Sequence, residues 1–132
     1  VICISTESNP VVAKRCEKLN INCYPGVGDK LGVLETILAG RHISMAQVAY
    51  VGNDVNDLEC LKAVGFTWLV PDAEQSLKQI FMPHLYLERN GGEGAVREAC
   101  DVIADAIEAH YSFRDINARV QEAKIFEQDY SA

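Results

Sequence analysis

Two carboxylates three residues apart, Asp54 and Asp57, follow the apolar run and the glycine of residues 48–52. The run is long enough for a buried strand, and apolar residues recur at helical spacing after Asp57, so the acids lie where a strand ends. Ligands of open parallel α/β sheets bind at the carboxyl ends of strands, and Mg²⁺ prefers oxygen ligands. The two acids are therefore candidates for holding Mg²⁺. The alternative is structural: Asp54 or Asn56 caps the helix, and Asp57 lies in its first turn.

A hydroxyl, an ammonium group and a glycine run occupy similar positions elsewhere. Thr6 follows the apolar run 1–4, Lys30 opens a predicted helix, and the glycine run 91–94 follows a predicted strand. Because the carboxyl ends of parallel strands meet at one edge of a sheet, we expect these groups to converge with the acids. The hydroxyl and the lysine can hold phosphate oxygens while the acids hold a charge-neutralising metal, which suits phosphoryl chemistry. Considered singly, Thr6 is also consistent with a strand or turn residue, Lys30 with a solvated lysine, and the glycines with a loop.

The chain alternates predicted strands with predicted helices. Polar and glycine residues mark the helix boundaries: Asn9 caps the first helix, Gly40 ends the second, and Asp72 caps the fourth. Strands are expected at 1–4, 21–24, 48–51, 66–70 and 84–87. Helices are expected at about 10–19, 29–39, 58–64, 74–80 and 95–110. Such alternation predicts an α/β fold, a three-layer Rossmann-like domain with a parallel sheet and helices on both faces.

The length of 132 residues and the hydrophobic content of 48% are those of a single globular domain. The net charge of −7 argues against a nucleic-acid partner and against an anionic membrane surface. No apolar run approaches membrane-spanning length and no signal peptide is visible, so we expect a cytoplasmic protein. The cysteines form no CxxC pair and no His/Cys set has zinc spacing, which favours reduced, partly buried thiols. The five cysteines are Cys3, Cys16, Cys23, Cys60 and Cys100.

The order of the groups, a hydroxyl, a lysine and then a GNDxxD-like acidic pair, resembles motifs two, three and four of the haloacid dehalogenase (HAD) superfamily. Five segments in the right order are similar to the small capless branch of that superfamily: 5–12, 28–30, 48–57, 70–73 and 91–98. That branch contains 3-deoxy-D-manno-octulosonate 8-phosphate phosphatases and the C-terminal domain of some acylneuraminate cytidylyltransferases. The resemblance covers roughly residues 1–103 and implies a HAD-like phosphatase domain at 1–111. Residues 112–132, which have no counterpart, are expected to form a C-terminal helical tail.

The resemblance implies a role for each candidate residue. Thr6 would bind the transferring phosphate, and Lys30 would contact both the phosphate and the nucleophile. Asp54 would be a ligand of Mg²⁺, and Asp57 would support the metal shell or Lys30. The residues implied to lie on the substrate side of the pocket are Gly91, Gly92, Gly94 and Arg97.

One departure from the family pattern is a missing nucleophile. The family nucleophile is the first aspartate of a DxD motif on a strand that precedes motif two, and this sequence contains no DxD. In the family's sheet that strand lies centrally, between the strands that end near Thr6 and Val51. We therefore expect an N-terminally truncated HAD-like domain whose nucleophile is outside this chain, so that the chain alone is inactive. The capless branch also implies a homo-oligomer, a tetramer, for the complete protein.

The leading expectation is a Mg²⁺-dependent phosphatase that acts on a sugar phosphate through an aspartyl-phosphate. The substrate would be of the 3-deoxy-octulosonate 8-phosphate or the nonulosonate 9-phosphate type. Ser8, where phosphatases of the branch often have a basic residue, slightly favours a domain attached to a sialic-acid activating nucleotidyltransferase. A second possibility is a non-catalytic assembly domain of such a synthetase. A third is a phosphoacceptor receiver domain, which ranks last because Lys30 precedes the acids instead of following them.

Overall fold

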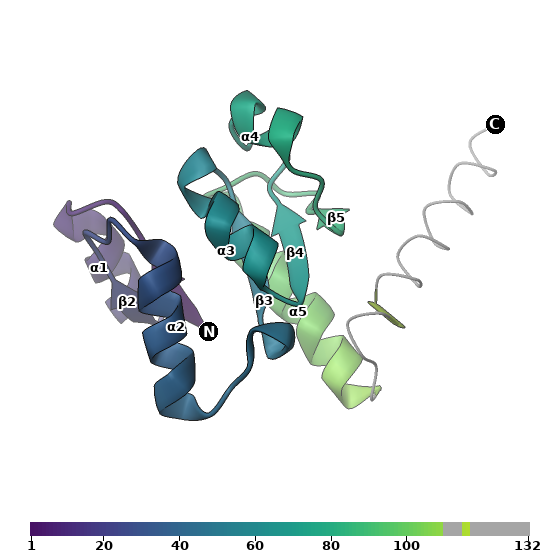
Figure 1. The fold of residues 1–132 in the computed structure, drawn as a ribbon, viewed down its shortest axis with the longest axis horizontal. Helices are drawn as coiled ribbons and strands as arrows, with labels where there is room; N and C mark the ends of the chain where they lie inside the picture. Colours follow the sequence, from purple (N-terminus) through teal and green to yellow (C-terminus); the bar gives the residue numbers. More distant parts are fainter. Residues whose placement is uncertain (110–114, 117–132) are drawn as a thin grey trace. The chain divides into compact units, whose positions relative to one another are not determined.

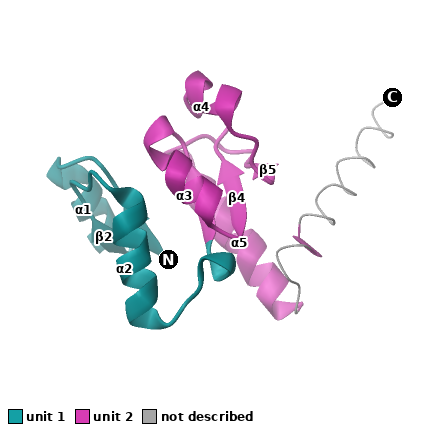
Figure 2. Cartoon of the chain, in the orientation of Figure 1, with its two compact units in different colours: residues 1–48 teal, residues 49–132 magenta. Residues whose placement is uncertain are grey.

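The structure is a computed structural model that describes residues 1–109, 115 and 116. The chain forms two compact units, Val1–Val48 (unit 1) and Ala49–Ala132 (unit 2), and each is described by itself (Figure 2). The division into a phosphatase domain at 1–111 and a tail at 112–132 stays a prediction, because nearly all of that tail lies outside the described residues.

Unit 1 contains a two-stranded parallel sheet in which Cys3 lies opposite Cys23. Its first helix begins as predicted: the Asn9 side chain accepts a hydrogen bond from the Val11 amide at 3.0 Å, and Pro10 occupies the first turn. The elements of unit 1 are β1 (Ile2–Ile4), α1 (Pro10–Lys18), β2 (Asn22–Tyr24), α2 (Lys30–Arg41) and the 3₁₀ helix η1 (Met45–Gln47).

Helix α2 begins as expected but ends later than the sequence suggested. Asp29 caps its start, accepting a hydrogen bond from the Gly32 amide at 3.0 Å. The prediction that Gly40 ends the helix is wrong. The chain leaves the helix at His42, which has a left-handed φ of 55°, and the amides of His42 and Ile43 bond back to the last turn. A left-handed residue at this position satisfies carbonyls that the helix leaves without partners.

Unit 2 contains a three-stranded sheet in the order β3-β4-β5, with both strand pairs parallel. Figure 1 shows α3 and α5 on opposite faces of this sheet. The elements of unit 2 are β3 (Ala49–Gly52), the 3₁₀ helix η2 (Val55–Asp57), α3 (Leu58–Ala63), β4 (Phe66–Leu69), α4 (Gln75–Ile80), β5 (Leu85–Tyr86) and α5 (Ala95–Glu108). The α/β fold with parallel strands is thus confirmed, and its described strands form one sheet in each unit.

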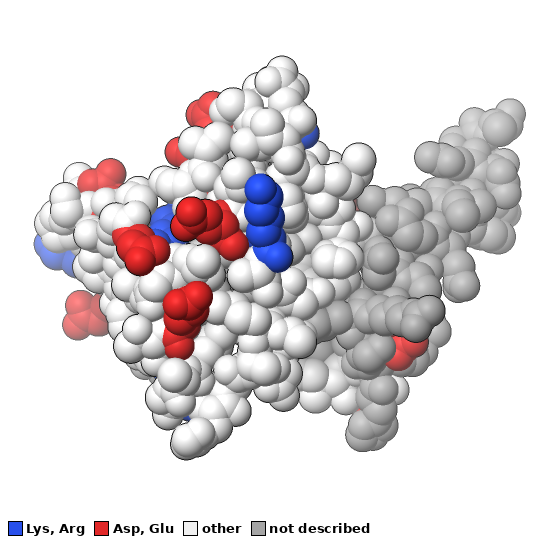
Figure 3. Space-filling model, viewed as in Figure 1, with Lys and Arg blue, Asp and Glu red and all other residues white. Residues whose placement is uncertain are grey.

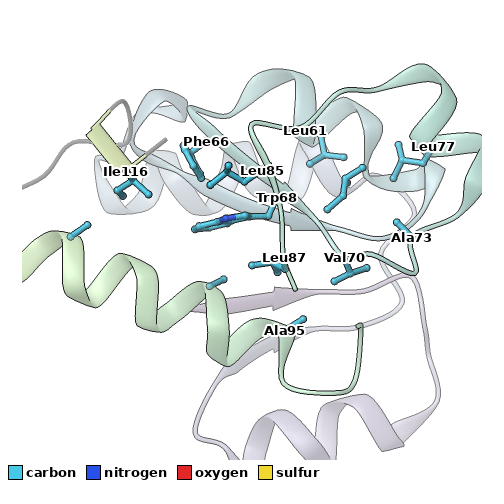
Figure 4. Packing of buried hydrophobic residues seen from close by; sticks show 13 residues of the cluster. Leu61, Phe66, Trp68, Val70, Ala73, Leu77, Leu85, Leu87, Ala95 and Ile116 are labelled. Carbon is cyan, nitrogen blue, oxygen red and sulfur yellow. The ribbon is translucent and has the colours of Figure 1, made fainter. Parts of the chain in front are cut away.

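The core of unit 2 surrounds β4, all four residues of which are buried. Trp68 and Leu69 are 2% and 0% exposed, and the rings of Phe66 and Trp68 meet edge to face with centroids 4.8 Å apart. Leu61 of α3 and Ala95 of α5 belong to the same cluster (Figure 4). Burying a large apolar side chain stabilises a fold by about 1.5–3 kcal/mol. This packing fixes β4, and with it the loops that follow the strands of unit 2.

The described helices include none that is both long and apolar enough to cross a membrane. Figure 3 shows one face of the molecule, on which both acidic and basic side chains of the described residues reach the surface.

Candidate functional site

Asp57 is the centre of the acidic loop that follows β3. Its side chain is buried, and the residue is only 2% exposed. One carboxylate oxygen, Oδ1, accepts a hydrogen bond from the Tyr50 hydroxyl at 2.6 Å. The other, Oδ2, accepts from the backbone amides of Asn53 and Asp54 at 3.0 and 3.2 Å. A carboxylate that receives several donors is well stabilised in a buried position, so Asp57 fixes the shape of the loop.

Tyr50 supplies the side-chain donor to this carboxylate from strand β3. Burial, and secondarily the negative charge of Asp57, raise the pKa of the Tyr50 hydroxyl above its usual value. The hydroxyl therefore stays protonated at neutral pH and continues to donate to Asp57.

Asp54 has different surroundings from Asp57. It is partly exposed at the carboxyl end of β3 and caps η2, with Oδ1 accepting a hydrogen bond from the Val55 amide at 2.6 Å. The structural alternative is confirmed for the 3₁₀ helix η2, which Asp54 caps and whose turn contains Asp57. For the predicted helix itself, α3, it is wrong, because Asp57 occupies the N-cap position there and makes no side-chain cap hydrogen bond. A partly exposed carboxylate at a strand end also fits a hard cation such as Mg²⁺, provided that other oxygen ligands complete the shell.

The loop depends on a glycine at the end of β3. Gly52 is buried, and a Cβ atom there would lie 2.9 Å from Cδ1 of Leu61 and 3.3 Å from Cβ of Asp57. A side chain at this position would thus collide with both α3 and the acidic loop. The glycine allows the backbone to pass close beneath Asp57.

The loop after β4 is tied to the glycine run by Asp72. Its Oδ1 accepts a hydrogen bond from the Gly91 amide at 2.9 Å. The prediction that Asp72 caps the following helix is wrong. Helix α4 begins at Gln75, its N-cap residue is Glu74, and no side chain forms a cap hydrogen bond there. The same loop contacts the acidic loop, since the Glu74 amide donates to the Asn53 carbonyl at 2.9 Å. Unit 2 thus brings together the loops that follow β3 and β4 and the start of the glycine run.

Two glycines of the run have backbone conformations that favour glycine. Gly92 and Gly94 have φ values of 76° and 95°. A Cβ atom on Gly94 would also lie 3.1 Å from Cδ of Arg89. The segment before the run is held by Glu98 of α5, whose carboxylate accepts hydrogen bonds from the amides of Glu88 and Arg89 at 2.9 Å. The run is therefore a fixed turn leading into α5.

Arg97, expected on the substrate side, lies in the first turns of α5. Its side chain is 87% exposed and forms a long ion pair with Asp101 at 3.9 Å. An exposed i, i+4 pair of this kind holds a side chain only weakly, so the guanidinium can reach other anions.

Thr6 and Lys30 both lie in unit 1, each after a strand of its sheet. The chain after β1 runs beside the chain after β2, because the Ser5 amide donates to the Tyr24 carbonyl at 3.0 Å and the Val27 amide donates to the Ser5 carbonyl at 2.9 Å. Thr6 is exposed in this segment, whereas Lys30 is the buried first residue of α2. The hydroxyl and the ammonium group thus belong to one unit, and the two aspartates with the glycine run belong to the other.

The sequence interpretation missed Tyr50, Asp72 and Glu98 as residues that shape the site. Asp72 offered a signal: it follows a buried strand and Pro71, as Asp54 follows β3. Tyr50 and Glu98 offered none, since their partners lie 7 and 9–10 residues away along the chain.

Comparison with known proteins finds similar sequences and similar solved structures. The chain is 36% identical over 106 residues to a 3-deoxy-D-manno-octulosonate 8-phosphate phosphatase of Escherichia coli K12, covering 78% of this chain and 54% of the relative. A structure from Legionella pneumophila, described as a HAD-superfamily hydrolase of subfamily III A, matches with 35% identity and a TM-score of 0.70 over 78% of this chain and 56% of that one. No protein-family model matches the chain.

A third match carries ligands. The 3-deoxy-D-manno-octulosonate 8-phosphate phosphatase of Moraxella catarrhalis, solved in complex with a magnesium ion, a phosphate ion and a KDO molecule, is 30% identical with a TM-score of 0.71. The match covers 80% of this chain and 62% of that one. The chain spans about half the length of the curated relatives it matches, 42% and 54% of two of them.

Proposed function

We propose that this chain is part of a divalent-metal-dependent phosphatase of a sugar phosphate. Its homologues are 3-deoxy-D-manno-octulosonate 8-phosphate phosphatases and HAD-family hydrolases, and its α/β fold matches that branch of the HAD superfamily. The observation that carries the proposal is the acidic loop at the end of β3, where a buried Asp57 holds a partly exposed Asp54 in place. Carboxylates held at a strand end suit the binding of a metal that neutralises phosphate charge.

The substrate class follows from the relatives. The curated relatives act, by their names, on 3-deoxy-D-manno-octulosonate 8-phosphate. The Moraxella structure contains a magnesium ion, a phosphate ion and a KDO molecule. We therefore favour this sugar phosphate over a nonulosonate 9-phosphate, and magnesium as the metal.

Each candidate residue has a proposed part in binding. Asp54 is proposed as the metal ligand of this chain, with Asp57 acting through the loop it holds. The metal would neutralise phosphate charge when bound. The Thr6 hydroxyl and the Lys30 ammonium group are proposed to hold phosphate oxygens, as charge-assisted donors do. The groups proposed for the sugar end are Gly91, Gly92, Gly94 and Arg97.

The reacting carboxylate is proposed to come from outside this chain, because the 132 residues contain no DxD. That carboxylate would attack phosphorus and displace the sugar oxygen, which leaves with a proton. Water would then attack the aspartyl-phosphate and release inorganic phosphate, which restores the carboxylate.

The test is phosphate release by the complete protein with magnesium. We expect Asp54→Asn and Lys30→Met to lower kcat at least about a hundredfold, as the loss of groups that stabilise transition-state charge does. Asp105→Asn, an exposed acid on α5, serves as the charge-matched control and should keep full activity. Parallel assays with the octulosonate and nonulosonate phosphates decide the substrate.

Full activity in Asp54→Asn would refute the proposed metal ligand. A complete protein that releases phosphate from neither sugar phosphate, yet forms a defined oligomer, would favour the non-catalytic assembly domain instead.

A further inference from the structure

Three cysteines from three different elements of unit 1 come together in space. They are Cys3 of β1, Cys16 of α1 and Cys23 of β2, and their Sγ atoms all lie within 4.8 Å of one another. Cys3 and Cys23 are register partners in parallel strands, so their side chains leave the same face of the sheet. Helix α1 packs against β2 and contributes Cys16, the buried residue of that helix. Among the described residues, this is the group of His, Cys, Asp and Glu side chains whose spacing fits a metal ion.

We propose that Cys3, Cys16 and Cys23 form a three-thiolate site for a thiophilic metal ion of the Zn²⁺ or Cu⁺ class. Thiolates select such soft or borderline ions over Mg²⁺ and Ca²⁺. A metal–sulfur bond of about 2.3 Å places the sulfurs of a three-thiolate site about 3.8–4.0 Å apart. The cluster therefore needs to contract by less than about 1 Å, which small side-chain rotations can supply.

The surroundings show why the metal-free cluster is stable. Burial, and then the neighbouring sulfurs of Cys16 and Cys23, raise the pKa of the Cys3 thiol to about 12. Burial and a hydrogen bond with Cys16 raise the pKa of the Cys23 thiol as well. Without a metal, the Cys3 and Cys23 thiols are therefore neutral and pack as small apolar groups. An entering metal ion replaces their protons, as is usual when thiols become ligands.

The spacing of the three cysteines in the sequence does not indicate a metal site. Zinc sites are identified by paired ligands a few residues apart, whereas these cysteines are separated by 12 and 6 residues. They become neighbours only because a parallel strand pair places Cys3 opposite Cys23 and the connecting helix covers them. The site is distinct from the proposed Mg²⁺ site, whose ligand Asp54 is a carboxylate of unit 2 and prefers a hard cation.

The test is a titration of the reduced 132-residue chain with Cd²⁺ in the absence of air, followed by ultraviolet absorbance. Thiolate-to-cadmium charge transfer should rise and saturate at one equivalent. Cys3→Ser, Cys16→Ser and Cys23→Ser should each abolish saturation at one equivalent. Cys100→Ser, a partly buried cysteine of α5, is the matched control and should bind as the unchanged chain does.

Several results would overturn the site. One is a charge-transfer band that fails to saturate at one equivalent in the unchanged chain. Another is a band that survives in all three serine variants, which would place the metal on other cysteines. Because Cys16 is buried, Cys16→Ala provides a second variant, and thermal unfolding shows whether each variant is folded. A folded Cys16→Ala that still binds at one equivalent would also overturn the proposal. The metal titration does not measure phosphate release, so its result is independent of the proposed phosphatase activity.

Discussion

The two aspartates of the acidic loop differ in what surrounds them. Asp57 is buried and receives three hydrogen bonds from Tyr50, Asn53 and Asp54, whereas Asp54 is partly exposed and caps a short helix. A carboxylate whose oxygens already accept donors is a poor candidate for direct metal ligation but a good one for positioning. The residue that can offer an oxygen to a metal is Asp54, and its position depends on Asp57.

Replacing Tyr50 by Phe should therefore loosen the acidic loop. The change removes the 2.6 Å hydrogen bond to Asp57, and a bond to a charged group contributes about 1.5–3 kcal/mol. The loss should depend on pH. The folded protein keeps the Tyr50 proton, whose pKa is raised, while the unfolded chain releases it near pH 10. Stability from this group is thus fully present below about pH 10 and falls as the pH rises further.

Urea unfolding of both proteins between pH 7 and 11 measures this effect. The difference in unfolding free energy between the unchanged chain and Tyr50→Phe should be constant up to about pH 10 and then narrow. A difference that stays constant to pH 11 would show that Tyr50 ionises equally in both states. The other tyrosines and the cysteines are common to both proteins, so their titration cancels.

Gly52→Ala should be strongly destabilising for a packing reason. The new Cβ would lie 2.9 Å from Cδ1 of the buried Leu61 side chain and 3.3 Å from Cβ of Asp57, so one of these neighbours must shift, and such overpacking costs about 1–3 kcal/mol. Gly40→Ala is the control, because Gly40 lies inside α2 with nothing within 4 Å. That change should stabilise the chain by up to about 1 kcal/mol through helix propensity. The melting temperatures of the two variants should therefore shift in opposite directions from that of the unchanged chain. Similar shifts in both variants would contradict the predicted contact.

For single residues, the sequence predicted the features that depend on near neighbours in the chain. The capping position of Asp54 and the first-turn position of Asp57 follow from their place after an apolar run, and both are observed in the 3₁₀ helix η2 that precedes α3. The bond from Tyr50 to Asp57 and the cysteine cluster could not be predicted, because they depend on side chains that the fold brings together from separate elements. The roles of Thr6 and Lys30 in phosphate binding stay predictions.

Among the elements, α2 is followed by a residue with an unfavourable backbone conformation. His42 ends the helix at a φ of 55°, in the left-handed region that non-glycine residues enter at a cost of about 1–2 kcal/mol. We expect His42→Gly to relieve part of this cost and raise the melting temperature. Arg41→Gly, at the last helical residue, should lower it. If both substitutions lower the melting temperature equally, the left-handed cap contributes no strain.

Element types were easier to predict than element ends. The five predicted strands and the five predicted helices appear in the predicted order among the described residues, because hydrophobic periodicity sets them. The 3₁₀ helices η1 and η2 were not predicted. The end of α2 was misplaced, since Gly40 has a helical conformation and the stop comes from His42. The role of Asp72 was also misassigned, because its carboxylate bonds to Gly91, 19 residues away, and not to its own helix.

For the whole molecule, the proposed function makes a prediction about this chain alone. It should release no phosphate from sugar phosphates or p-nitrophenyl phosphate in the presence of Mg²⁺, because no DxD aspartate is present to attack phosphorus. Phosphate release by the purified 132-residue chain measures this directly. Metal-dependent turnover that survives purification and disappears in Asp54→Ala would mean that another residue is the nucleophile.

The core of unit 2 also contains an intrinsic fluorescence probe of unfolding. Trp68 is the only tryptophan, and it is 2% exposed beside Phe66. Its indole fluorescence, excited selectively, therefore reports unit 2 and should shift to longer wavelength when water reaches the ring on unfolding. Far-ultraviolet circular dichroism follows the helices of both units. If the two signals change at the same denaturant concentration, the units unfold as one cooperative body. If the fluorescence changes separately, each unit has its own stability.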